Sequence, residues 1–305
     1  MDLFIRKILR QTVQMRLYAA AIGKWTVVSF LIGCLCGGLG SAFHVGVEWV
    51  TLFRLTHPWL IWLLPAAGVA IVGLYHLLGV DGHSTNNIIS EVQSGEGLRL
   101  NLIPAIFVST LLTHLCGGSA GREGAALQMG GTLGYEVGRL FNLDERDIRT
   151  ATIAGMAGFF SALFGTPLAA AIFAMAVISV GLLYHAALIP SLFSSLTAYG
   201  LSRLFGIEPV HYAVAAPEVG VFMFFKVVLL AALCALVSSL FCDFLHHMEA
   251  AMRRWFPNSF LRAVAGGIAL ILLSLLFPVD YNGTGTGVIR LAVEEGTAHP
   301  LAFLL

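Results

Sequence analysis

The chain has 305 residues, of which 58% are hydrophobic and 11% are charged, and its mean hydropathy is +0.86. Soluble domains carry roughly 25% charged residues, so this composition excludes a soluble globular fold, and its apolar content excludes a disordered chain. Seventeen basic and seventeen acidic residues cancel, which leaves no basic surface for nucleic acid. The composition predicts an all-α, multi-pass membrane protein whose surroundings are the lipid bilayer.

The first 24 residues are predicted to form a basic segment on the cytoplasmic side. Its only acid is Asp2, and its basic residues are Arg6, Lys7, Arg10, Arg16 and Lys24. Positive charge flanking the first apolar segment favours a cytoplasmic N-terminus. Apolar residues recur at near-helical spacing over residues 3–20, which predicts an amphipathic helix on the membrane surface. We expect the membrane to be that of a bacterial cell.

The apolar segments that follow are unusual in being short or interrupted. They lie at about 26–53, 59–79, 102–116, 124–141, 150–163, 167–186, 187–204, 219–247, 260–278 and 300–305. Several fall below the roughly 20 residues that a full membrane span needs, and prolines such as Pro104, Pro167 and Pro190 break others. This pattern predicts discontinuous helices that end inside the membrane, where transporters commonly build their ion sites. A packed bundle with glycine at its helix crossings would explain some of the glycines, but not the short segments.

Two stretches of the chain resemble each other. Residues 80–97 read VDGHSTNNIISEVQSGEG, and residues 279–296 read VDYNGTGTGVIRLAVEEG. Each begins with Val-Asp, crosses a polar loop, enters a short helix and leaves at Glu-Gly. The match predicts two related halves, the usual plan of transporters.

The repeat predicts the organisation of the domains. We expect a basic N-terminal helix at 1–24, a first membrane repeat with the anion-site loops at 25–215, and the start of a second repeat at 216–305. The second copies of the richest motifs would then fall beyond Leu305, so we expect the second repeat to be incomplete and the chain to be C-terminally truncated.

The motif with the most candidate functional residues is GGSAGREGAALQMGG at residues 117–131. Glycines before a helix start let the backbone approach a ligand, and the free N–H groups and the helix dipole form an anion site there. We expect the anion at the backbone of Gly121, Arg122, Gly124, Ala125 and Ala126. Glu123 stands at the helix start, where its carboxylate competes with the anion when ionised and leaves when protonated, so Glu123 is the predicted gate. The alternative is a capped helix with a local Arg–Glu ion pair.

These residues also resemble a known family. The GREG stretch resembles the gating-glutamate motif of the CLC family of chloride channels and anion/proton antiporters. Residues 154–175, AGMAGFFSALFGTPLAAAIFAM, are similar to that family's Gly/Ala-rich helix, proline break and apolar helix, and the loop GHSTNNI at 82–88 stands where the family has its first anion-binding motif.

The resemblance covers residues 25–305 and implies both a fold and a function. It implies an inverted repeat of tilted, partial helices, usually a homodimer, that transports chloride or a similar small anion and catalyses no bond chemistry. In the first loop it implies a side chain that donates a hydrogen bond to the anion, and the candidates for it are His83, Ser84 and Thr85. No cofactor is implied beyond the chloride ion as ligand.

Some positions depart from the family pattern. Ala176 and Val177 stand where acidic residues are usual, and a valine at the proton-relay position cannot carry protons. The fluoride-selective branch also lacks that glutamate, but it usually has a methionine in the first loop, and none lies between residues 16 and 128. Chloride is therefore the expected ion. The alternatives are a fluoride-selective or proton-coupled antiporter and a non-conducting remnant.

No metal site is expected either. His246, His247 and Glu249 do not form an H-E-x-x-H arrangement, and the arginines that follow them indicate a membrane boundary. The five cysteines contain no C-x-x-C pair and are interpreted as packing residues.

Overall fold

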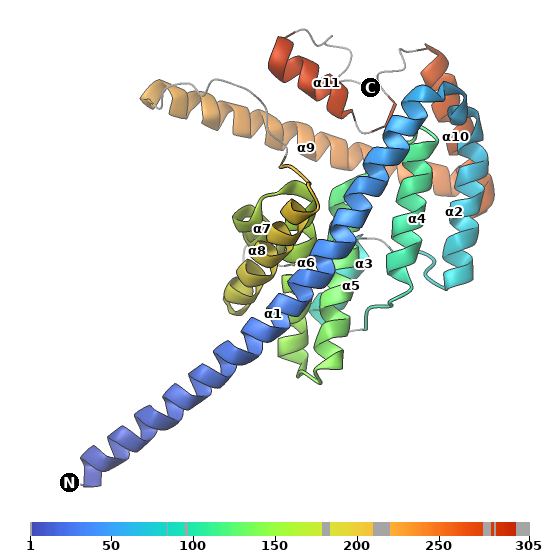
Figure 1. The fold of residues 1–305 in the computed structure, drawn as a ribbon. Coiled ribbons are helices and arrows are strands. Elements are labelled where there is room, and N and C mark those ends of the chain that lie inside the picture. Colours follow the sequence, from blue (N-terminus) through green and yellow to red (C-terminus); the bar gives the residue numbers. More distant parts are fainter. Residues whose placement is uncertain are drawn as a thin grey trace. The chain divides into compact units, whose positions relative to one another are not determined.

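The computed structural model describes residues 2–83, 85–94, 97–178, 184–209, 220–276, 282–283 and 285–296. Within these ranges every regular element is a helix and there is no strand (Figure 1). The predicted all-α class is therefore confirmed. The predicted apolar segment at 300–305 lies outside the described residues.

The chain divides into two compact units, each assembled from separate stretches of sequence. The first unit comprises Met1–Phe53, Leu74–Leu111 and Ala120–Val210, and the second comprises Arg54–Gly73, Leu112–Ser119 and His211–Leu305. Helix α1 runs unbroken from Asp2 to Thr56, through the predicted boundary after residue 24. The predicted domains 1–24, 25–215 and 216–305 stay a prediction.

The first unit is built around one buried helix. Its elements include α3 (Thr85–Ser94), α5 (Arg122–Leu140), α6 (Glu145–Phe164), α7 (Pro167–Ile178), η2 (His185–Ala187) and α8 (Leu188–Leu204), with parts of α1 and of α4 (Leu102–Leu115). Helix α6 packs against α3, α5, α7, η2 and α8. Its buried face is rich in Ala and Gly, which lets neighbouring helices come close.

Capping residues fix where α6 begins and ends. The Asp144 side chain accepts a hydrogen bond from the Asp147 N–H at 2.8 Å, which satisfies one of the free donors at the helix start. The helix stops at Gly165, whose φ of +68° is in the left-handed region. Pro167 then begins α7, because its ring suits the first turn of a helix. The predicted proline break is confirmed.

The second unit contains long helices whose apolar side chains are exposed. Its elements include η1 (Pro58–Leu63), the start of α2 (Leu64–Leu78), α9 (Val221–Trp255), α10 (Ser259–Leu276), α11 (Thr286–Arg290) and the π-helix η4 (Leu291–Glu295). Helix α9 has no buried residue, and its large apolar side chains are exposed. Helix α10 approaches α2 closely, since a Cβ atom at Gly267 would lie 2.8 Å from the Pro65 backbone.

Helix lengths support the prediction of spanning and partial helices. Four helical stretches of the described chain are long and apolar enough to cross a bilayer, namely Tyr18–Thr56, Pro58–Leu78, Val221–Trp255 and Ser259–Leu276. Helix α4 has 14 residues and α7 has 12. At about 1.5 Å per residue these two are shorter than the hydrocarbon core of about 30 Å. Both stretches of the predicted repeat contain a short helix after their polar loop, α3 in the first and α11 in the second.

Candidate functional site

The GREG motif lies at the start of α5. Gly121 is extended, with φ −66° and ψ 132°, and its position before the helix carries no side-chain cap. The first backbone N–H groups of an α-helix have no partner inside the helix, so this start presents donors and the positive end of the helix dipole. The predicted helix start is confirmed, while the binding of an anion to it stays a prediction.

Glu123 is exposed in the first turn of α5. A Cβ atom built on Gly121 would lie 3.2 Å from its Oε2 atom, so the carboxylate folds back toward the residue before the helix. An anionic group in this position is stabilised by the helix dipole. The carboxylate therefore stands near the N–H groups that an external anion would use.

The neighbouring arginine has a different partner. The Arg122 guanidinium lies over the ring of Phe164, 5.8 Å from its centroid, and forms no ion pair with Glu123 among the described residues. The alternative of a local Arg–Glu pair is therefore wrong for this structure. The cation–π contact links the start of α5 to the end of α6.

The residues after Glu123 are held by packing. Gly124 is half-buried, Ala125 is 5% exposed and Ala126 is fully buried. Further along α5, a Cβ atom at Gly134 would lie 2.2 Å from the Ala151 carbonyl oxygen. The close contact with α6 fixes the helix, so one side of its first turn is packed while Gly121 and Glu123 stay open.

In the first loop, the ring of His83 faces other groups of the protein. His83 Nδ1 lies 3.1 Å from the Val80 carbonyl oxygen, and Nε2 lies 3.7 Å from Glu91 Oε1. Both ring nitrogens thus have a protein group nearby, and an anion at Nε2 would meet the Glu91 carboxylate. The role of His83 as a donor stays a prediction. Ser84 lies outside the described residues, and Thr85 begins α3, of whose side chain nothing is described.

The two departures from the acidic pattern lie at the end of α7. Val177 is half-buried and packs against the main core, whereas Ala176 is exposed. Neither side chain can hold a proton.

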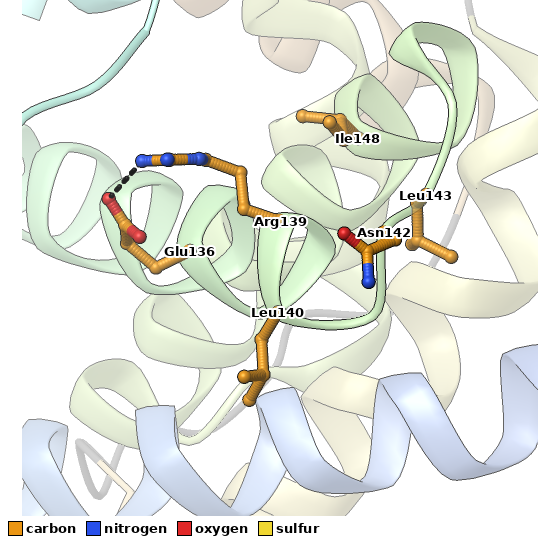
Figure 2. A pocket seen from close by; sticks show the side chains of 6 residues that line it. All are labelled: Glu136, Arg139, Leu140, Asn142, Leu143 and Ile148. Atoms are coloured by element: carbon orange, nitrogen blue, oxygen red, sulfur yellow. Dashed lines mark ion pairs between the residues drawn. The ribbon is translucent and has the colours of Figure 1, made fainter.

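A cavity of about 460 Å³ lies at the other end of α5 and at the turn into α6. Figure 2 shows two of its lining residues, Glu136 and Arg139, facing one another, with 3.7 Å between Glu136 Oε1 and Arg139 Nη1. None of the predicted anion-site residues lines it. Its first lining residue on α5, Glu136, lies thirteen positions after Glu123, which is about 20 Å along the helix at 1.5 Å per residue. No motif in the sequence pointed to this cavity.

The described residues contain no group of three or more His, Cys, Asp or Glu side chains that could hold a metal ion.

The sequence matches the model of a known family. The model of the family described as "Voltage gated chloride channel" matches residues 78–305. A "Chloride/fluoride channel protein" of Pseudomonas syringae pv. tomato is 34% identical over 252 residues, which cover 82% of this chain and 56% of that protein. An "H(+)/Cl(-) exchange transporter ClcA" of Cronobacter sakazakii is 32% identical over 48% of this chain and 35% of that protein. The chain thus spans about half the length, or less, of these curated relatives.

Solved structures resemble the fold as well. One described as a CLC-type fluoride/proton antiporter has a TM-score of 0.86 and 32% identity, covering 93% of this chain and 73% of that one. One described as a slow cyanobacterial Cl⁻/H⁺ antiporter has a TM-score of 0.72 and 20% identity, covering 92% of this chain and 71% of that one, which shows a shared fold.

Proposed function

Because the chain belongs to the voltage-gated chloride channel family, we propose that it carries a small inorganic anion across the bilayer through a pathway gated by Glu123. Its helices make it a multi-pass integral membrane protein. The observation that carries the proposal is the Glu123 carboxylate, folded back at the start of α5.

The gate works by competition for one set of donors. The ionised carboxylate occupies the helix start and keeps an anion away, because two negative charges at one site repel each other. Protonation removes the charge, so the side chain swings out and the anion takes its place at the backbone N–H groups of Gly124, Ala125 and Ala126. Arg122, held over Phe164, adds positive charge beside the site.

Fluoride is the second candidate for the anion, beside the chloride that the sequence favours. The Pseudomonas relative, named for chloride and fluoride, aligns over 82% of this chain, and the structural relative with the higher TM-score is described as a fluoride/proton antiporter. The curated protein named for chloride and proton exchange aligns in sequence over 48% of the chain, and the chloride/proton antiporter structure, which covers 92% of it, is 20% identical against 32% for the fluoride/proton antiporter. These differences in sequence coverage and identity favour fluoride although the first loop lacks a methionine.

The test is anion release from vesicles that contain the purified chain. Vesicles loaded with both chloride and fluoride are diluted into a medium free of both, and ion-selective electrodes follow each release. Release faster than from protein-free vesicles supports the proposal, and the ratio of the two rates identifies the preferred anion. Release at the protein-free rate for both ions would contradict transport and favour the non-conducting alternative.

The assembly and orientation belong to the same proposal. We expect a homodimer in a bacterial membrane. We expect its N-terminus to be cytoplasmic, since the first 24 positions hold five basic residues against one acid. In a variant whose five native cysteines are replaced by serine, labelling of a cysteine introduced at the N-terminus should succeed only after the membrane is opened. Labelling of intact cells would contradict this orientation.

A further inference from the structure

An arginine near the end of α1 is buried with few partners. Arg54 is only 8% exposed. Its Nη2 atom donates a hydrogen bond to the Asn282 carbonyl oxygen at 3.3 Å, and its buried Nε atom has no hydrogen-bond partner. No carboxylate of the described residues lies within ion-pair distance of it. A charge removed from water needs an opposite charge or a full set of hydrogen bonds, and the described residues supply only part of that.

A cavity of about 160 Å³ adjoins this side chain within the second unit. Three of its lining residues are polar, namely Arg54, Ser274 and Asn282, and the others are Leu55, Pro58, Ile61, Trp62, Ile271 and Leu275. The Ser274 hydroxyl lies 2.8 Å from both the Leu270 carbonyl oxygen and Asn282 Oδ1. Asn282 is thereby held beside the cavity by its side chain while its carbonyl binds the guanidinium.

Two glycines lie beside the Arg54 side chain, and Gly283 leaves the space next to the guanidinium open. Gly283 has φ +89°, and a Cβ atom there would lie 2.9 Å from Arg54 Nη2. Gly117 has φ +85°, and a Cβ atom there would lie 3.6 Å from Arg54 Cδ. Both backbone conformations are ones that glycine adopts readily. Gly117 also opens the loop that leads to Glu123, six positions later in the sequence.

We infer that this cavity binds a monovalent, weakly hydrated inorganic anion such as chloride or bromide as the counter-ion of Arg54, at a site separate from Glu123. One guanidinium supplies one positive charge, which matches a single negative charge. Apart from Ser274 and Asn282, which bond to each other, the other walls are apolar, so the cavity offers too few donors for the several oxygens of a phosphate group. The inference holds whichever anion the gated pathway carries.

The test is X-ray diffraction at the bromine absorption edge from crystals of the full chain grown in bromide. The wild type should show an anomalous peak in the cavity within ion-pair distance of the Arg54 guanidinium. R54Q should lose this peak, and R54K should keep a weaker one, because it retains the charge but not the planar donor group. R254Q is the matched control, since it removes an exposed arginine of α9 and should leave the peak unchanged.

The E123Q variant separates this site from the gate. Its cavity peak should equal that of the wild type even if transport changes. No bromide peak in the wild type would overturn the inference, as would a lipid phosphate or a protein carboxylate in its place. A peak of unchanged height in R54Q would overturn it too. If R54Q does not fold, the test is the comparison of the peak in the wild type with the weaker peak expected in R54K.

Discussion

At the scale of single residues, Val177 is the most informative departure from a proton-coupled transporter. Its side chain is half-buried against the core of the first unit and has no group that can hold a proton. An acid at this place would be partly desolvated, which favours its neutral form and lets it take up protons. We therefore expect no proton relay through residue 177, because its side chain lacks a group that could carry the proton.

We predict that Val177→Glu changes proton movement more than anion movement. The new carboxyl group supplies a proton carrier in a chain that has none at this position. The measurement follows vesicle pH and anion release together, and Val177→Gln is the control because it has a similar size without a titrating group. If the unmodified protein already moves protons uphill on an anion gradient, another proton route exists and this prediction fails.

Asp144 offers a test of local stability. Its side chain caps α6, the helix around which the first unit packs. Asp144→Ala should lower the free energy of unfolding by about 1 kcal/mol, because the Asp147 N–H loses its acceptor. Asp144→Ser should keep most of the stability of the wild type, because a serine hydroxyl can also accept this hydrogen bond. Thermal unfolding in detergent measures both. Equal midpoints for the alanine and serine variants would show that the cap contributes little.

The sequence predicted a residue's position well where that position depends on sequence neighbours. It predicted a residue's surroundings poorly where they depend on residues far away in the sequence. Glu123 was placed at a helix start because the glycines and the helix formers around it are neighbours in sequence, and α5 begins at Arg122. The burial of Arg54 depends instead on Asn282, 228 positions away. His83 was predicted as a donor without any sign that Glu91 would face its ring. No local pattern carries such contacts.

At the scale of elements, the crossing of α5 and α6 decides where Glu123, the proposed gate, lies. The two backbones touch at glycines, since a Cβ atom at Gly155 would lie 2.1 Å from the Gly130 carbonyl oxygen. Helices that approach this closely pack through their backbones and tolerate only small residues. The sequence predicted both helices, but their register on each other is set by packing that no single segment reveals.

We predict that Gly134→Ala is destabilising, because its Cβ atom would fall 2.2 Å from the Ala151 carbonyl oxygen. Overpacking of this kind costs roughly 1–3 kcal/mol. Gly200→Ala in α8 is the control: no heavy atom lies within 4 Å of its added Cβ, and alanine favours a helix. Thermal unfolding should place the first variant below the wild type and the second at or above it. The opposite order would mean that α5 and α6 do not cross as described.

At the scale of the whole molecule, the composition alone indicated a membrane protein, and the lengths of the helices indicated that some of them are partial. Low charge and high hydropathy predicted a membrane protein, and the short α4 and α7 fit partial helices. The predicted basic segment 1–24 and the first apolar segment form the single helix α1, and the predicted division after residue 24 stays a prediction. Helix propensity continues through residue 24, so neither charge nor hydropathy marks a break there.

The central claim is that Glu123 gates the anion pathway, and the pH dependence of anion release tests it most directly. Release is measured from vesicles over a range of external pH for the wild type, Glu123→Gln and Glu136→Gln. The last variant makes the same change near the far end of α5 and is the matched control. Glutamine imitates the protonated carboxyl group, so Glu123→Gln should release anion at a rate nearly independent of pH, while the wild type and the control speed up as pH falls. A Glu123→Gln protein that kept the pH dependence of the wild type would contradict the account.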